Sequence, residues 1–147
     1  MSTFHIENRS YASYNELSDG LKDALIATED VRFYNHSGID FRSLARVVVK
    51  SVLMGNRRSG GGGSTISQQL AKSLFPRDTV ESKFPGAKYF VLVNNKLKEW
   101  ITAVKLERNY TKEEIMSMYF NAVFFGSNPY GIKAAANTLF AKHPKDL

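Results

Sequence analysis

The sequence contains no cysteine, which rules out disulfide bonds, thiolate zinc sites and a cysteine nucleophile. The compartment stays open, because an exported domain can also lack cysteine. Three histidines, His5, His36 and His143, are too scattered to indicate a multi-histidine metal site. The chain has no apolar run of about 18 residues, and its first residues lack the apolar stretch of a signal peptide. We therefore expect a chain without an anchor of its own, either cytosolic or separated from the anchor of its parent.

The composition is that of a globular protein. The 147 residues fit one domain, 43% of them are hydrophobic and 23% are charged. Lys and Arg outnumber Asp and Glu by 20 to 14, giving a net charge of +6. This charge favours an anionic partner, such as a phosphate, a pyrophosphate, an acidic membrane surface or a nucleic acid. Nucleic acid is the weaker choice, because no recognised nucleic-acid-binding motif occurs.

Helical spacing and capping residues predict a mainly α chain. The expected helices run from Leu17 to Glu29, from Asp40 as N-cap to Gly55, from Ser64 or Thr65 as N-cap to Phe75, from Asn95 to Arg108, from Lys112 to Phe120 behind a Thr111 capping box, and from Ile132 to Phe140.

Two segments between these helices are harder to interpret. The glycine-rich stretch 56–63 predicts a flexible loop. Residues 76–94 combine prolines with the apolar run 89–93, which fits a short strand, a helix start or a patch that touches a membrane.

The polar stretch 29–38 crowds acidic, basic, aromatic and glycine residues together with little apolar periodicity. Transfer to a sugar hydroxyl needs a base near the acceptor oxygen, and Glu29 is the best candidate. Its structural alternative is a solvated glutamate at a helix end. Asp30 fits a role in ordering the turn through local backbone amides, and His36 fits either that role or a second proton transfer.

A second group of residues surrounds the start of the third expected helix. Ser64 and Thr65 would place hydroxyls and free backbone amides together, with Gln69 and Lys72 one and two turns further on. This pattern predicts a pyrophosphate cradle. It is not a nucleotide P-loop, because Gly63 stands where that motif requires lysine.

In the same helix, we expect Ile66, Leu70 and Leu74 on the buried side, and Gln68, Gln69 and Lys72 elsewhere. Further along the chain, Lys96 and Glu99 are three residues apart on one helix face. Taken alone, they fit an ordinary ion pair worth about 0.2 to 0.5 kcal/mol.

Taken in order, these motifs resemble the peptidoglycan glycosyltransferase domain of class A penicillin-binding proteins and monofunctional transglycosylases. The five matching segments are Glu29, Asp30, Phe33, His36 and Gly38; Gly63, Ser64 and Thr65 with Gln68, Gln69 and Lys72; Lys96 with Glu99; residues 115–121, ending in Asn121; and residues 131–136, continuing to Lys142. The resemblance covers nearly the whole chain from about residue 17, and its first two motifs are highly specific.

The resemblance implies a mainly α, lysozyme-like domain that polymerises lipid II at the outer face of the bacterial inner membrane. Glu29 would be the general base on the acceptor 4-hydroxyl, and undecaprenyl pyrophosphate would leave with inversion at C1. The implied catalytic residues are Glu29 and Glu99, and the implied substrate-binding residues are Asp30, Phe33, His36, Ser64, Thr65, Gln68, Gln69, Lys72, Lys96 and Asn121.

The same resemblance implies partners beyond the protein. These are lipid II, a lipid-linked glycan strand, the membrane surface and the inhibitor moenomycin. No cofactor is certain, although Glu99 could act on the donor phosphates through a divalent cation, Mg²⁺ or Mn²⁺.

Three departures from the family pattern qualify these expectations. Asn95 stands where the third motif usually opens with arginine, so Arg57, Arg58 or Lys98 would have to supply that contact. The connection 76–94 is longer than usual and falls in the membrane-facing jaw. The chain also stops where the family continues, so we expect one truncated domain over residues 1–147, without anchor or transpeptidase domain and prone to self-association.

Two other functions fit parts of the pattern. A non-catalytic basic helical module could bind anionic lipid or nucleic acid, with the carboxylates merely solvated. A lysozyme-type hydrolase could share the fold, but the pyrophosphate cradle would then have no purpose.

Overall fold

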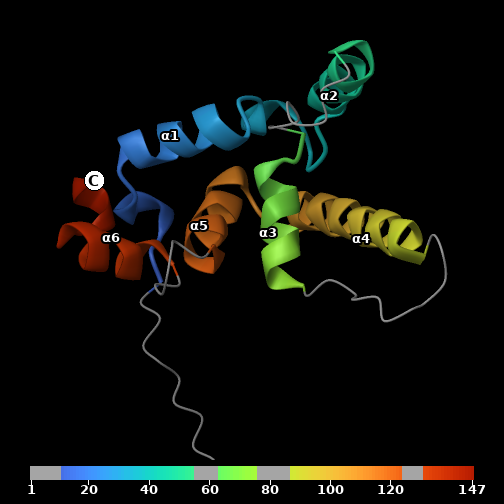
Figure 1. Ribbon diagram of the computed structural model, residues 1–147. Coiled ribbons are helices and arrows are strands. Elements are labelled where there is room, and N and C mark those ends of the chain that lie inside the picture. Colours follow the sequence, from blue (N-terminus) through green and yellow to red (C-terminus); the bar gives the residue numbers. More distant parts are fainter. Residues whose placement is uncertain (1–10, 55–62, 76–86, 124–130) are drawn as a thin grey trace, which may run out of the picture.

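The computed structural model describes residues 11–54, 63–75, 87–123 and 131–147 (Figure 1). Its helices are α1 (Asp19–Glu29), α2 (Phe41–Met54), α3 (Ile66–Leu74), α4 (Ala87–Asn109), α5 (Lys112–Ala122) and α6 (Ile132–Phe140), with short 3₁₀ turns at Tyr14–Glu16, Phe33–Asn35 and Pro144–Asp146. No strand occurs in these ranges, so the predicted mainly α class is confirmed. Within the same ranges, no helix is both long and apolar enough to cross a membrane.

The helices begin where capping side chains replace missing backbone partners. Ser18 accepts from the amide of Leu21 at the start of α1, and Thr65 accepts from the amide of Gln68 at the start of α3. Asp40 accepts from two amides at the start of α2. The predicted capping box of Thr111 is present at the start of α5. Each such cap contributes about 1 kcal/mol, which explains why these starts were predictable.

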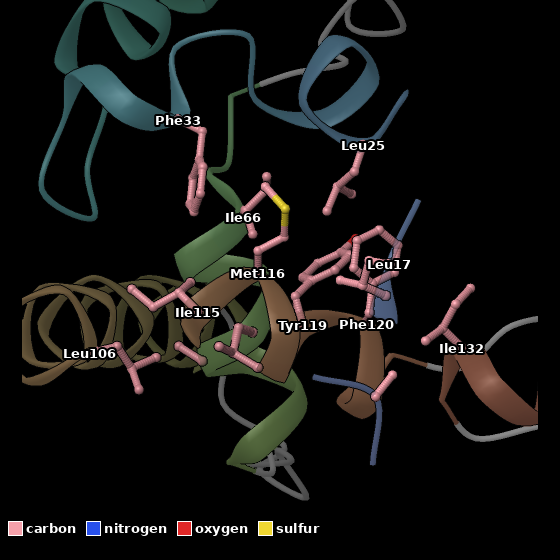
Figure 2. Close-up of a cluster of buried hydrophobic side chains, with 13 residues drawn as sticks. Leu17, Leu25, Phe33, Ile66, Leu106, Ile115, Met116, Tyr119, Phe120 and Ile132 are labelled. Carbon is pink, nitrogen blue, oxygen red and sulfur yellow. The ribbon is translucent and has the colours of Figure 1, made fainter. Parts of the chain in front are cut away.

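Helix α3 packs against both α4 and α5, and in the view of Figure 1 it lies between them, with α1 above α5. Apolar side chains from several elements point into a shared cluster, which Figure 2 shows. Its members are Ala12, Leu17, Leu25, Phe33, Ile66, Leu70, Ala71, Leu106, Ile115, Met116, Tyr119, Phe120 and Ile132. This core fixes α3 relative to α1 and α5, and those three helices carry the candidate site.

Helix α3 departs from the expected burial pattern at two positions. Ile66 and Leu70 are fully buried as predicted, but Leu74 is 45% exposed. Gln68, expected away from the buried side, is 2% exposed. Its side-chain Nε2 donates to the carbonyl of Gly38 at 3.2 Å, which offsets part of the cost of burying a polar group, while its Oε1 is buried with no partner among the described residues.

The long helix α4 turns a polar side to the protein. Its buried residues are Asn95, Glu99, Ala103 and Leu106. Its large apolar residues Tyr89, Phe90, Val93, Leu97 and Ile101 are exposed and share one stripe at helical spacing. We call this surface the α4 stripe. Of the interpretations left open for 76–94, the helix start holds for the residues from Ala87 onward, and the earlier residues lie outside the described ranges.

Helix α2 also has exposed apolar residues. It stands apart from the other helices in Figure 1. Phe41, Val48, Val49 and Leu53 are all more than half exposed. Exposed apolar patches of this kind mark interaction surfaces.

Candidate active site

A cavity of about 190 Å³ opens where the end of α1, the side of α2 and the start of α3 meet. Its lining residues are Thr28, Glu29, Asp30, Val31, Asp40, Ser43, Arg46, Val47, Lys50, Gly63, Ser64 and Thr65. Three carboxylates and two basic side chains thus share one hollow. Glu29 is one of these lining residues and, as predicted, lies at the end of α1.

The Glu29 carboxylate is held by a neighbouring helix. The side-chain Nε2 of Gln69 on α3 donates to Glu29 Oε2 at 2.7 Å. The Oε1 of Gln69 in turn accepts from the hydroxyl of Tyr119 on α5 at 3.2 Å. Three helices therefore contribute one side chain each to a continuous hydrogen-bonded chain that ends on the carboxylate.

Tyr119 has an environment that keeps it protonated. Burial and, to a smaller extent, the negative charge of Glu29 together raise the pKa of its phenol to about 12. The hydroxyl is therefore a neutral donor over the whole physiological range.

Asp30 follows Glu29 but faces the protein interior. Both of its carboxylate oxygens lie 3.0 Å from His36 Nε2, and Oδ2 also accepts from the backbone amide of Ile66 at 3.0 Å. The side chains of Asp30 and His36 are each only 4% exposed. The Asp30 carboxylate thus connects the loop after α1 to the first turn of α3, 36 residues further along the chain. The sequence had favoured bonds from Asp30 to nearby backbone amides instead.

The protein itself already uses two of the backbone amides at the start of α3, where the sequence predicts an anion site. The Ile66 amide donates to the Asp30 carboxylate, and the Gln68 amide donates to the Thr65 hydroxyl oxygen. Thr65 itself is buried and donates to the carbonyl of Gly38 at 2.7 Å. The positive end of the α3 dipole is therefore used to fix Asp30.

Gly38 makes this arrangement sterically feasible. Its φ of +93° belongs to the region that only glycine adopts readily. A Cβ at this position would lie 2.8 Å from the carbonyl carbon of Ala103 in α4. His36 Nδ1 accepts from the Gly38 amide at 3.3 Å, so its Nε2 carries the proton donated to Asp30. Both ring nitrogens of His36 are thus bonded within the protein, which favours the structural one of its two expected roles.

Two further predicted residues lie in the interior. Phe33 is fully buried in the core, with the Lys112 ammonium 4.4 Å from its ring centroid. Asn121 pairs with the backbone of Ala12 through both its side-chain oxygen and its amide nitrogen, each at 2.8 Å. For Asp30, Phe33, His36, Thr65, Gln68 and Asn121, the structure provides protein partners where the sequence suggested substrate contact.

The third motif forms a compact polar group at the wall of the cavity. Lys96 Nζ lies 3.0 Å from Glu99 Oε2 and donates to Ser64 Oγ at 2.9 Å. Glu99 is 6% exposed, whereas Lys96 is partly exposed. The buried carboxylate thus holds the ammonium against the loop that leads into α3. Lys72 is exposed, one turn beyond Gln68 and Gln69 on α3.

The described residues supply little for a protein-held metal. No three His, Cys, Asp or Glu side chains converge at metal-binding distance within the described ranges. Glu99, the residue implied as a cation ligand, already has the Lys96 ammonium on Oε2. The group formed by Lys96, Glu99 and Ser64 therefore fits the binding of an anion better than the coordination of a divalent cation.

Sequence reasoning missed three residues of this site. Arg46 and Lys50 on α2 line the cavity, and Tyr119 on α5 bonds Gln69. The first two are four residues apart in the sequence, a spacing that puts them on one helix face. No sequence pattern connects Tyr119 to residues 50 and 90 positions earlier. Arg57 and Arg58, suggested as substitutes for the arginine missing at Asn95, lie outside the described residues.

The helical fold and the carboxylate-lined basic cavity agree with the family that the motifs suggested. The chain belongs to the transglycosylase family, whose model, described as "Transglycosylase", matches residues 1–147. The resemblance inferred from the five motifs is thereby confirmed.

Curated relatives agree with this assignment. Penicillin-binding protein 1F of Bacillus subtilis (strain 168) is 42% identical over 147 residues, which make up 100% of this chain and 19% of that protein. Penicillin-binding protein 1A of Aquifex aeolicus (strain VF5) is 37% identical over 99% of this chain and 18% of its own length. The corresponding protein of Neisseria flavescens is 36% identical over 96% of this chain and 16% of its own. The chain thus spans less than a fifth of the length of these relatives.

Proposed function

We propose that this chain carries the glycosyl-transfer site of a peptidoglycan glycosyltransferase, which polymerises lipid II into glycan strands. The observation that carries the proposal is the Glu29 carboxylate, fixed by Gln69 in a cavity that also contains Arg46 and Lys50. A positioned base beside cationic groups is what glycosyl transfer from a pyrophosphate donor requires.

In the proposed reaction, Glu29 accepts the proton of the 4-hydroxyl of the acceptor N-acetylglucosamine. We assign proton uptake to Oε1, the oxygen that Gln69 does not bond. The acceptor oxygen forms a new bond to C1 of the lipid-linked donor strand as the bond from C1 to the pyrophosphate breaks. Undecaprenyl pyrophosphate leaves, and the configuration at C1 is inverted.

The cationic side chains would stabilise the negative charge that develops on the leaving group. Lys96 is the best-placed candidate, because Glu99 and Ser64 fix its ammonium. Arg46 and Lys50 from α2 supply the further positive charge that Asn95 cannot. Lys72 extends the same basic surface along α3. Glu99 acts by positioning Lys96.

The exposed apolar surfaces support contact with a membrane. The α4 stripe and the apolar residues of α2 offer aromatic and aliphatic side chains to an interface, near lysines that favour anionic headgroups. We propose that these surfaces hold the site at the extracytoplasmic face of the bacterial inner membrane, where a lipid-linked substrate is found. Without a membrane, the same surfaces would promote self-association of the chain.

The test of the proposed function is lipid II polymerisation with the Glu29→Gln variant. We expect the wild-type chain to elongate glycan strands and Glu29→Gln to lose at least about 100-fold in turnover, the low end for a general base. Glu113→Gln, an exposed glutamate of α5, removes the same charge outside the cavity and should retain activity. Equal turnover in both variants would exclude Glu29 as the base, whereas a wild-type chain without turnover would favour the non-catalytic basic module.

A further inference from the structure

We propose that Tyr119 and Gln69 are positioning residues for the transfer reaction, with the Tyr119 hydroxyl fixing the Gln69 amide and that amide fixing the Glu29 carboxylate. The inference rests on the proposed role of Glu29 as base. It changes the expected role of Gln69, which the sequence placed on the pyrophosphate.

The orientation of the Gln69 amide follows from hydrogen-bond chemistry. An ionised carboxylate can only accept, so Gln69 must turn its NH₂ group toward Glu29, where the distance is 2.7 Å. The amide oxygen then faces Tyr119, whose hydroxyl donates at 3.2 Å. Both polar atoms of Gln69 are thus bonded to protein, which suits a residue that holds another side chain in place.

Packing in the core fixes the position of the Tyr119 side chain. Its side chain is 6% exposed and belongs to the apolar cluster of Figure 2. Its ring packs edge-on against Phe120, with the ring centroids 6.0 Å apart. Gln69 lies on α3, where the neighbouring residues Leu70 and Ala71 are buried. Two packed helices therefore determine where the amide points.

Glu29 needs such support. It is the last residue of α1, where the negative end of the helix dipole disfavours an anion. Glutamate also has several rotatable bonds, so an unsupported side chain would sample many positions. A hydrogen-bonded chain anchored in the core lowers the cost of bringing the base to the acceptor hydroxyl. The bonds also polarise one another, because each donates toward the negative charge.

The first experiment tests the hydrogen-bonded chain without catalysis. The ¹³Cζ resonance of Tyr119 is measured at neutral pH in protein labelled at its seven tyrosines and is assigned with Tyr119→Phe. Gln69→Ala removes the acceptor of the hydroxyl, so we expect this resonance to shift while the other tyrosines keep theirs. An unchanged Tyr119 resonance would overturn the proposal whether or not the chain is active.

The second experiment asks whether the chain of bonds serves turnover. We expect Tyr119→Phe to lower kcat roughly five-fold, the factor that one hydrogen bond is worth, with KM unchanged. Because Tyr119 acts through Gln69, the double variant with Gln69→Ala should be no slower than Gln69→Ala alone. Tyr110→Phe, which removes a hydroxyl at a half-exposed position after α4, is the matched control and should behave as wild type.

The outcomes separate this inference from the proposed function. Multiplicative losses in the double variant would show that Tyr119 does not act through Gln69, and would overturn the positioning role. Absence of turnover in the wild-type chain would count against the proposed function, while the resonance shift would still establish or refute the bonded chain.

Discussion

Replacing Asp30 should destabilise the protein more than any exposed acidic residue, although Asp30 is next to the proposed base. In Asp30→Ala, the His36 Nε2–H and the Ile66 amide both lose their acceptor in a buried environment. Each unsatisfied buried donor costs about 1 to 3 kcal/mol. Both together give about 4 kcal/mol, in line with the ~3 to 5 kcal/mol for breaking a buried pair.

Asp30→Asn should cost less, because the asparagine oxygen can still accept from the Ile66 amide. Its NH₂ group would face the His36 Nε2–H, so His36 would have to move its proton to Nδ1. That nitrogen now accepts from the Gly38 amide, and this bond would be lost. We therefore expect a loss of about 2 kcal/mol, between those of the wild type and the alanine variant.

Urea denaturation followed by far-UV circular dichroism measures these differences. For a chain of this size, 4 kcal/mol corresponds to a fall in Tm of roughly 8 to 16 °C, which thermal unfolding would also detect. Asp23→Ala, an exposed position of α1, is the control and should stay within about 0.5 kcal/mol of wild type. Equal losses for Asp30→Ala and Asp23→Ala would refute the argument that Asp30 joins the loop to α3.

Three further predictions concern other parts of the molecule. Gly38→Ala should lower the free energy of unfolding by more than about 1 kcal/mol, because Gly38 has a positive φ and no room for a Cβ. Gly20→Ala, in open space on α1, should raise it by about 0.5 to 1 kcal/mol. Urea denaturation measures both, and the opposite order would contradict the argument that Gly38 is required by its φ. The pKa of Glu16 is lowered from the ordinary value of 4.5 to about 2, chiefly by the hydrogen bond with Lys133. Ionised Glu16 therefore stabilises the folded state above pH 4.5, and this contribution should be lost as the pH falls toward 2. Lys133→Met should weaken this acid dependence of Tm, and an unchanged dependence would count against the pair. Moenomycin should bind the folded chain in calorimetry and bind Lys96→Ala at least about ten-fold more weakly; equal affinities would exclude Lys96 from the donor site.

Helix positions were predictable because their signals are local. The predicted end of α1 at Glu29, the capping box at Thr111 and the full extent of α6 agree with the structure, since caps and helical spacing act within a few residues. Burial was less predictable. Asn95 and Glu99 on α4 are buried while Leu97 and Ile101 are exposed, because this helix turns its polar side toward the site and its apolar side outward.

The candidate site was predictable in residue type but not in role. The motifs located Glu29, Asp30 and Gln69, but nothing in the sequence says that Asp30 would accept from the Ile66 amide at the start of α3. Such contacts join residues about 40 positions apart, and only the packing of the helices determines them. Tyr119 was missed for the same reason, because its partner lies 50 residues earlier.

Helix α3 explains why motif residues divide into two groups. Ile66 and Leu70 fix its inner side in the core, and Asp30 fixes its first turn. Gln69 then leaves the same helix toward Glu29. The buried motif residues determine where α3 lies, and the position of α3 determines where the carboxylate points. A substitution in the buried group should therefore reduce stability and turnover together, whereas Tyr119→Phe, which keeps the ring in the core, should reduce turnover mainly.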